Sequence, residues 1–565
     1  MKLRFQHANP RRGRESLILR FEGVLREQVV CVLVDAGAGV DVSESLDPEE
    51  GEHLAAICLT HAHLDHYRSL GANLRDGAPV YATPDTAAIL GDAFDAGADH
   101  YDLGDTDAVL DRLDPVDDWT TIVAGVRVRP VPAGHAPGAA GFLFEVEDGD
   151  ARRTVLVTGD FTARRAAGYP GFDPDLPVGV DVLVLTGATN ETFEATLTDA
   201  VATAYERVTA GSTVLATASG LTGVHLGYLL GHLAAARDDP VPVTLVGHVA
   251  TLHERLDYDV PNVTAVPDFA DPASVLRPGG VTIAGPEVPV GGSAERLFAA
   301  IEDDPAATLL QVVNGGTDPV CGAGCTVRDF ALSNHPSRET VDDVVERLSP
   351  VHVVVTHQRG RAADRYKDCY DSFVWVTDDT DVYTLLDESG WTPPPWVTEA
   401  TERRIRARRE MDGRQLHTAL ADGDIPLPSV TRGDDVDLAA EGLDLTALRD
   451  RLPTREGPET GSDGSTPASD GSTSVSDGSA ASSADGERTA EAADGAGALA
   501  DEATVSALTA RLDRIEAAVT GQSHPARAVD AGDGVFLLRL DAPPDWLEHG
   551  DRLDVLLREP ADRTD

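Results

Sequence analysis

The sequence predicts an α/β fold that is interrupted by a second α/β unit and followed by a long tail. Short apolar runs alternate with helical stretches up to residue 190, and a second set of buried-strand runs occupies residues 191–330. Residues 331–390 then return to the pattern of the first unit. Because 565 residues exceed what one hydrophobic core accommodates, more than one domain is expected.

The first unit, residues 1–190, contains runs of valine, isoleucine, leucine and phenylalanine bounded by charged or turn-forming residues. Such runs predict strands. The strands expected here are Ser16–Phe21, Val29–Asp35, Ala55–Thr60, Val80–Ala82, Val126–Pro130, Phe142–Val146 and Thr154–Thr158.

The second unit, residues 191–330, has apolar runs separated by helical segments, a pattern typical of a parallel sheet. Its expected strands are Val214–Ala218, Val241–Val246, Val281–Ala284 and Leu309–Val313. We expect this unit to be an insertion, since the first pattern resumes at residue 331.

The tail begins with an arginine-rich extension over residues 391–453. Guanidinium groups pair bidentately with phosphate, so this cluster is either a phosphate-tracking surface or the solvated face of a helix over residues 402–415 with its own ion pairs. Its arginines are Arg403, Arg404, Arg406, Arg408, Arg409 and Arg414.

Residues 454–500 are almost all Ser, Gly, Asp, Ala, Thr and Glu, which predicts a disordered linker. A helix over 501–521 follows, whose apolar residues are spaced three and four apart: Val505, Leu508, Leu512, Ile515 and Val519. This seam over residues 505–519 either joins copies of the chain into a homo-oligomer or docks on a neighbouring surface. A small β-rich tail, residues 522–565, ends the chain, with strands expected at Val535–Leu540 and Leu553–Leu557.

The chain carries a formal net charge of −50, with 96 acidic and 46 basic residues, of which only Lys2 and Lys367 are lysine. Such a surface is typical of proteins from salt-in halophiles, where concentrated cations screen the repulsion between carboxylates. The acidity therefore reflects the solvent more than the ligand. Met1–Glu15 is polar and no window approaches the roughly 18 apolar residues of a membrane span, so we expect a cytoplasmic protein without membrane association.

The stretch His61–His66 follows a strand-like run and holds three imidazoles and a carboxylate within six residues. Imidazole and carboxylate are the usual ligands of zinc. We expect His61 and His63 to bind one metal ion, and Asp65 and His66 to bind a second. The spacing therefore predicts a site for two zinc ions, with manganese as the alternative.

Further ligands stand at the ends of later predicted strands. His135 follows Val126–Val131 and is assigned to the first metal. Asp160 ends the run Val155–Asp160 and is expected to bridge both ions, and His357 ends the run Val353–His357 and is assigned to the second metal. A single histidine after a strand is weak evidence, but together these residues complete a dinuclear site.

In these motifs the chain resembles the metallo-β-lactamase superfamily and, within it, the RNA-processing branch of the β-CASP nucleases, which includes cleavage and polyadenylation endonuclease subunits and RNase J. The resemblance covers roughly residues 14–387. Besides the metal motifs, it rests on Gly13-Arg14-Glu15-Ser16, Val34-Asp35-Ala36-Gly37, Thr83-Pro84-Asp85-Thr86, Thr158-Gly159-Asp160-Phe161, Gly279–Pro286, Val290–Ser293 and Leu332-Ser333-Asn334-His335. It implies an αββα sandwich with a β-CASP α/β domain inserted.

The resemblance also implies roles for individual residues. His335 would act at the scissile phosphate, and Asp35 would hydrogen-bond a ligating histidine from behind. Asp65 and Asp160 would fix the ions. The DNA-repair branch usually has valine where this chain has His357, so the histidine favours single-stranded RNA as the substrate.

Two departures from the family pattern concern activity. The carboxylate that would orient His335 is replaced by Thr186, with Glu191 as a nearby substitute whose direction the sequence does not reveal. The family's Gly-Arg-Ala-Gln-Glu helix start appears as Gly223–Gly227, without its arginine and glutamate.

We therefore expect a metal-dependent phosphodiester hydrolase, a ribonuclease of RNA processing or decay, with endonuclease and exonuclease action left open. Two alternatives remain at this point. One is a non-catalytic β-CASP-like scaffold subunit, suggested by Thr186 and by the tail. The other is a small-molecule metallo-hydrolase of glyoxalase type, which shares the metal motif but which the insertion at 191–330 disfavours.

Overall fold

A computed structural model describes residues 1–98, 100–237, 241–314, 318–358, 360–367, 369–411, 427–452, 526–530 and 536–540. The chain divides into two compact units, Met1–Thr460 and Gly461–Asp565. In the second unit only an antiparallel hairpin is described, formed by β22 (Ala526–Asp530) and β23 (Phe536–Leu540). The predicted linker, the heptad helix, Arg414 and the strand Leu553–Leu557 lie outside the described residues.

The first unit begins with an eight-stranded sheet in the order β21-β20-β1-β2-β3-β4-β5-β6. From β3 onwards the strands run parallel, so their carboxyl ends meet at one edge. The strands are β1 (Lys2–His7), β2 (Leu17–Leu25), β3 (Gln28–Val34), β4 (Glu52–Cys58), β5 (Val80–Ala82), β6 (Leu113–Pro115), β20 (Tyr383–Asp387) and β21 (Gly390–Trp391).

A second, seven-stranded sheet has the order β19-β18-β11-β10-β9-β8-β7. Its central strands are almost entirely valine and leucine, as expected of parallel strands buried on both faces. They are β7 (Thr120–Val123), β8 (Val126–Pro132), β9 (Ala140–Asp148), β10 (Ala151–Val157), β11 (Val182–Thr186), β18 (His352–Thr356) and β19 (Phe373–Trp375).

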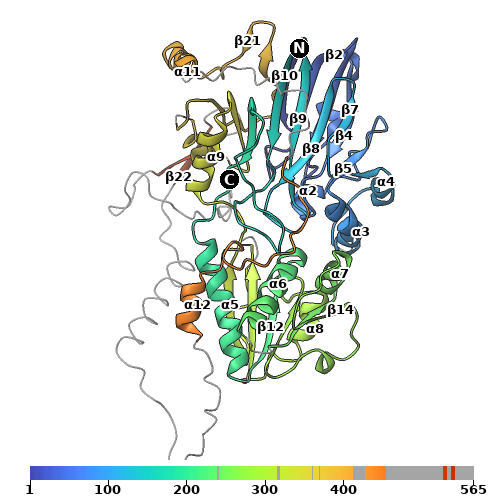
Figure 1. Cartoon of the computed structure of the whole chain (residues 1–565), viewed down its shortest axis with the longest axis vertical. Coiled ribbons are helices and arrows are strands. Elements are labelled where there is room, and N and C mark those ends of the chain that lie inside the picture. Colours follow the sequence, from blue (N-terminus) through green and yellow to red (C-terminus); the bar gives the residue numbers. More distant parts are fainter. Residues whose placement is uncertain are drawn as a thin grey trace, which may run out of the picture. The chain divides into compact units, whose positions relative to one another are not determined.

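The two sheets face each other, and one apolar cluster unites their inner faces, with Phe5 and Val32 from the first sheet packing with Phe144 and Val184 from the second (Figure 1). Helices cover the outer faces. The first sheet is covered by α3 (Pro84–Ala98), together with the short helices α1 (Val42–Ser45), α2 (Leu64–Tyr67) and α4 (Thr106–Asp111). The αββα sandwich expected from the family resemblance is confirmed.

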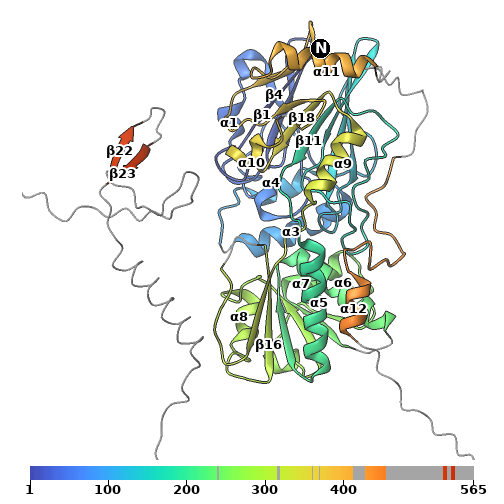
Figure 2. The ribbon, with the colours of Figure 1, turned by 90° about the vertical axis from the view of Figure 1, so that its left-hand side faces the viewer.

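A third sheet, of six parallel strands in the order β14-β13-β15-β12-β16-β17, forms the inserted domain. Figure 2 shows its helices on both sides of the sheet. The strands are β12 (Thr213–Thr217), β13 (Val243–Val246), β14 (Val263–Val266), β15 (Gly280–Ala284), β16 (Ala307–Val313) and β17 (Thr326–Ala331). Helices α5 (Phe193–Thr209), α6 (Gly220–Ala236) and α7 (His248–Arg255) pack on one face, and α8 (Gly292–Phe298) on the other.

The insertion enters and leaves the second sheet between neighbouring strands. The chain leaves after β11 and returns through α9 (Arg338–Leu348) to β18, which pairs in parallel with β11. The loops that follow these two strands therefore lie side by side, beside the inserted domain.

Helix α10 (Gly360–Asp364) lies between β18 and β19. Past the sandwich, α11 (Glu399–Met411) is followed by residues 427–452, which we call the strap and which end in α12 (Leu445–Arg451). The strap runs against both domains: Arg165 of the sandwich binds Asp435, and Arg451 binds Asp199 and Glu206 of α5. Sequence patterns placed it in an arginine-rich extension and gave no sign of this path. Among the described residues, no helix has both the length and the hydropathy needed to cross a lipid bilayer.

Several strands differ from those expected. Strands β1 and β17 were not expected, because charged residues interrupt both: β1 alternates Lys2 and Arg4 with buried residues, and β17 contains Arg328 and Asp329. β17 is an edge strand, where charged residues are common, whereas β1 is paired on both sides by β2 and β20. The arginine-rich helix begins at Glu399, earlier than the expected residue 402.

Candidate metal centre

The motif His61–His66 lies where β4 ends at the carboxyl edge of the first sheet, as a turn that leads into α2. His61 and His66 are fully buried, whereas Asp65 lies exposed at the surface of a cavity. The residue before the turn is held by Asp35, because the Thr60 amide donates to Asp35 Oδ1 at 2.8 Å. This hydrogen bond restricts the conformation of the backbone that carries the candidate ligands.

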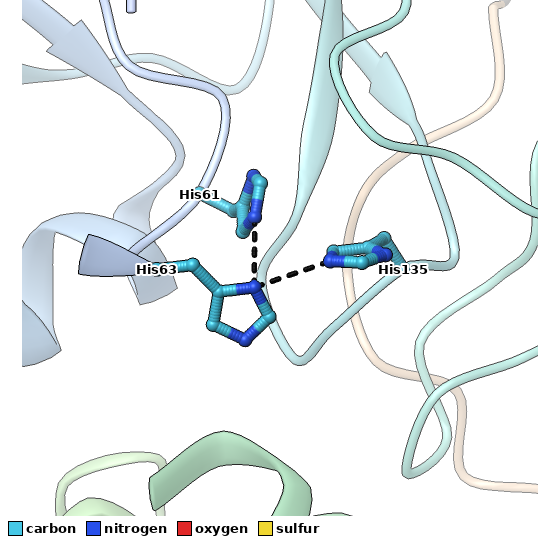
Figure 3. A group of neighbouring side chains, drawn as sticks. All are labelled: His61, His63 and His135. Atoms are coloured by element: carbon cyan, nitrogen blue, oxygen red, sulfur yellow. Dashed lines mark hydrogen bonds between the residues drawn. The ribbon is translucent and has the colours of Figure 1, made fainter. Parts of the chain in front are cut away.

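His61, His63 and His135 form the first group of candidate ligands (Figure 3). His63 Nδ1 lies 2.9 Å from His61 Nε2 and 3.1 Å from His135 Nε2. Two imidazole nitrogens on one tetrahedral zinc are about 3.4 Å apart, so these separations suit a shared ion. Burial and the neighbouring His135 lower the pKa of His63 to about 3, which keeps the ring neutral and able to bind metal.

Asp160 stands between two pairs of histidines. Its Oδ2 lies 3.4 Å from His66 Nε2 and 3.8 Å from His135 Nε2. Its Oδ1 lies 3.6 Å from His357 Nδ1 and 3.9 Å from His335 Nδ1. Although burial opposes it, these neighbouring rings hold the pKa of Asp160 well below its usual range, so the carboxylate is ionised. Asp160 occupies the place expected of a bridging ligand.

Four buried polar atoms around Asp160 have no hydrogen-bond partner among the described residues. They are His66 Nε2, Asp160 Oδ1, His335 Nδ1 and His357 Nε2. Orphaned polar atoms are rare in protein interiors because each costs desolvation energy. Their convergence, with a donor set of imidazole nitrogens and carboxylate oxygens, fits divalent ions of the zinc type.

Asp35 supports His66 from behind. His66 Nδ1 donates to Asp35 Oδ2 at 2.8 Å, and the Thr60 hydroxyl donates to the same carboxylate at 2.9 Å. The bond fixes the tautomer of His66 and leaves Nε2 for a metal. Burial opposes protonation, but Asp35 and Asp65 raise the pKa of His66 well above its usual value. Asp35 itself has a left-handed φ of 58°, a strained conformation of the kind found at functional sites.

His135 is held by the loop through which the insertion returns. Its Nδ1 donates to the backbone carbonyl of Asn334 at 2.7 Å, and the side-chain amide of Asn334 (Nδ2) donates back to the His135 carbonyl at 2.6 Å. Arg164 donates to Asn334 Oδ1 at 3.0 Å and to the His335 carbonyl at 2.8 Å. Asn334 and Arg164 thus orient His135 and His335 together. The sequence patterns predicted no role for Asn334 or Arg164. The only signal was that Asn334 directly precedes His335 in the chain.

Glu191 does not orient His335. It therefore does not replace the carboxylate that the family resemblance leads us to expect for this role. The Glu191 side chain accepts from the Arg338 amide at 2.8 Å and so caps α9. Thr186 is buried and its hydroxyl accepts from the Ala188 amide at 3.3 Å. Burial lowers the pKa of His335 to about 4. The loop is held instead by Arg164 and by Asn190, whose side chain donates to the Ser333 carbonyl at 2.8 Å.

His357 reaches the site through a strained turn after β18. Its φ is 57°, and its amide donates to the Arg14 carbonyl at 3.2 Å. The arrangement brings the ring against that of His66, with the ring centroids 5.7 Å apart. All the residues predicted from the sequence as ligands or catalytic groups are therefore brought together in one place.

The centre opens into a cavity of about 450 Å³ between the sandwich and the inserted domain. The sandwich contributes the ligands His63, Asp65, His135 and Asp160, and the returning loop contributes His335. The inserted domain contributes Ser219, Leu221, Thr222, His225 and Asn314. A ligand on the metal centre is thus placed to contact the inserted domain as well.

Comparison with known proteins gives one family match and several similar proteins. Residues 31–214 match the family model of the β-lactamase superfamily domain. Ribonuclease TTHA0252 of Thermus thermophilus is 34% identical over 150 residues, 25% of this chain and 32% of that protein. Endoribonuclease YSH1 of Gibberella zeae is 25% identical over 193 residues, 30% of this chain and 22% of that protein.

Protein artemis of Gallus gallus is 32% identical over 115 residues, 19% of this chain and 15% of that protein. The chain therefore spans about a third or less of the length of these relatives.

Proposed function

Since this chain belongs to the β-CASP nucleases of the metallo-β-lactamase superfamily, we propose that it is a metal-dependent ribonuclease acting in RNA processing or decay. The observation that carries the proposal is the convergence of the ligand residues with four orphaned buried polar atoms, at a cavity shared by two domains. A hydrolase of small thioesters would not require a cavity that is also lined by residues of the inserted domain.

RNA is the proposed substrate for two reasons. Two of the similar proteins are named ribonuclease and endoribonuclease. In addition, His357 occupies a position at which the DNA-repair branch usually has valine, and its ring lies within reach of Asp160. Protein artemis and a DNA cross-link repair protein of Schizosaccharomyces pombe are also similar, so DNA is the substrate to test against RNA.

Two divalent ions, zinc or manganese, would be held by His61, His63 and His135 on one side and by Asp65, His66 and His357 on the other, with Asp160 between them. Bound there, they supply Lewis-acid activation of a water and of the phosphodiester. Asp35 keeps His66 in the tautomer that leaves Nε2 free. His335 lies at the mouth of the centre, where its ring can hydrogen-bond a phosphate oxygen or pass a proton to the leaving oxygen.

The test combines metal analysis with cleavage of labelled RNA by protein purified in concentrated KCl. Wild type should contain two metal ions per chain and cleave single-stranded RNA, and Asp160→Asn should lose most of both properties. The matched control is Asp118→Asn, an exposed carboxylate that pairs with Arg129 at 3.0 Å outside the centre.

Full activity of Asp160→Asn would refute the proposal. Stoichiometric metal without cleavage of any RNA or DNA would instead favour the non-catalytic scaffold. Thioester hydrolysis without nuclease activity would favour the glyoxalase-type enzyme.

A further inference from the structure

His225 stands on α6, on the side of the cavity that the inserted domain provides. It lines the same cavity as His63, Asp160 and His335, although it is not a metal-ligand candidate. The residue is buried, with 7% of its surface exposed. A polar ring at this place is available to whatever occupies the cavity.

The ring of His225 is held by Glu441 of the strap. His225 Nε2 donates to Glu441 Oε2 at 2.7 Å. The Glu441 carboxylate is completely buried and also accepts from the amides of Ala167 and Gly168, both at 2.7 Å. Three donors around one buried carboxylate fix its position, and charge-assisted hydrogen bonds of this kind are the strong ones.

Glu441 is anchored on both sides of the cavity through the rest of the strap. The Ala440 carbonyl accepts from the Arg165 amide of the sandwich at 2.8 Å. Arg432 donates to the Leu256 carbonyl at the end of α7 at 2.9 Å, and the Asp444 amide donates to Thr198 of α5 at 3.0 Å. The carboxylate is therefore in a fixed place relative to α6.

With Nε2 bound to Glu441, Nδ1 is the polar atom of His225 left for a ligand, and among the described residues it has no hydrogen-bond partner. An imidazole held by a carboxylate in this way is oriented before the ligand arrives, which reduces the entropy lost on binding. Because the ring proton lies on Nε2, Nδ1 accepts a hydrogen bond, and the ribose hydroxyls of a strand bound at the metal centre would enter the same cavity as donors.

We infer that His225 contacts the RNA strand bound at the metal centre, through Nδ1, and that Glu441 is its positioning residue. This inference rests on the proposed ribonuclease function. The inference gives the strap a part in substrate binding, because the strap holds His225 in place. His225 stands at the start of α6, where the arginine and glutamate of relatives are absent.

The test compares KM and kcat for labelled single-stranded RNA among wild type, His225→Gln, Glu441→Gln and the double variant. Loss of one hydrogen bond to the strand should raise KM in His225→Gln by about fivefold, with the effect in KM rather than kcat. Glu441→Gln should raise KM by a smaller factor and add nothing in the His225→Gln background. The control is His232→Gln, on the same helix but outside the cavity residues.

Three results would overturn the inference. The first is an unchanged KM in His225→Gln, and the second is an equal effect of Glu441→Gln in both backgrounds, which would mark Glu441 as a purely structural residue. The third is wild-type protein that hydrolyses a small phosphodiester, bis(p-nitrophenyl) phosphate, but neither binds nor cleaves RNA. That third result removes the ribonuclease function as well, whereas the first two leave it standing.

Discussion

The backbone carbonyl of Asn334 accepts a hydrogen bond from His135 Nδ1 at 2.7 Å, so the loop that returns from the inserted domain orients a histidine of the metal centre. Because a carbonyl only accepts, Nδ1 carries the proton and Nε2 is free to bind metal. We therefore expect the position of the inserted domain and the affinity for metal to be coupled through this bond.

Asn334→Ala should weaken metal binding by up to about tenfold, the lower end of what outer partners of a ligating histidine contribute, because the backbone carbonyl that holds His135 stays and only its side-chain support is lost. The variant loses the bonds from Asn334 to the carbonyls of Gly134 and His135. Competition with a chelator measures the change. The control is Asn262→Gly, which removes an asparagine from a left-handed turn of the inserted domain, where φ is 63°, and should leave affinity unchanged. Equal affinities in both variants would contradict the coupling.

Asp35→Asn should lower metal affinity by about 10- to 100-fold while preserving the fold. Asparagine tolerates the left-handed φ of 58° at this position, but it has one accepting oxygen, whereas Asp35 accepts from the Thr60 amide through Oδ1 and from His66 through Oδ2. Calorimetric titration of metal-free protein with zinc gives the affinity, and thermal unfolding reports the fold. An affinity equal to that of Asp118→Asn would refute this role.

His357→Val should destabilise metal-free protein by about 1–2 kcal/mol more than His357→Asn, because a β-branched residue is strained at a φ of 57°. Both variants lose the same ring, so the difference isolates the backbone. Urea unfolding in the presence of a chelator measures it. The control is the same pair of substitutions at His53, in strand β4. There the valine variant should be more stable than the asparagine variant, since valine favours strands. A more stable valine variant at 357 would contradict the strain.

His7 should make the fold less stable as the pH falls. Its ring is buried with no hydrogen-bond partner among the described residues, and burial lowers its pKa to about 4 from 6.5. The unfolded chain therefore takes up a proton between pH 6.5 and 4 that the folded chain does not. The resulting decrease in the free energy of unfolding reaches about 3 kcal/mol below pH 4 and is absent above pH 6.5.

The measurement is the unfolding free energy of wild type and of His7→Leu across this pH range. The wild-type curve should fall more steeply than that of the variant, and parallel curves would show that His7 does not contribute. Taking the difference removes the pH dependence that the metal ligands share in both proteins.

Salt should stabilise the folded chain, because a net charge of −50 opposes compaction. The melting temperature should rise from about 0.1 M to about 3 M KCl as the Debye length falls below 3 Å. NaCl should act similarly if screening is the cause. A melting temperature independent of both salts would refute the halophilic interpretation of the composition.

The local parts of the metal centre were predictable from the sequence. His61–His66 lie in one turn, and His135, Asp160 and His357 each follow a strand whose carboxyl end lies at the same edge as the others. The periodicity that reveals a strand also reveals where it ends. The family resemblance, confirmed by the comparisons, supplied the sandwich and the inserted domain.

The supports of the centre were not predictable in the same way. Arg164 and Asn334 are separated by 170 residues, and His225 and Glu441 by 216. No short-range pattern connects such pairs, because packing between domains brings them together. For the same reason Glu191 looked available to His335, whereas the fold directs it to the start of α9.

The strap also changes the mechanics of the molecule. The two chain crossings between sandwich and inserted domain lie together, since Asn190 on one contacts Ser333 and Pro336 on the other, and two adjacent attachments act as a single hinge. A third attachment through the strap, which is bonded to Arg165 on one side and to α5 and α7 on the other, opposes rotation about that hinge. The strap therefore opposes any change in the width of the cavity between the two domains.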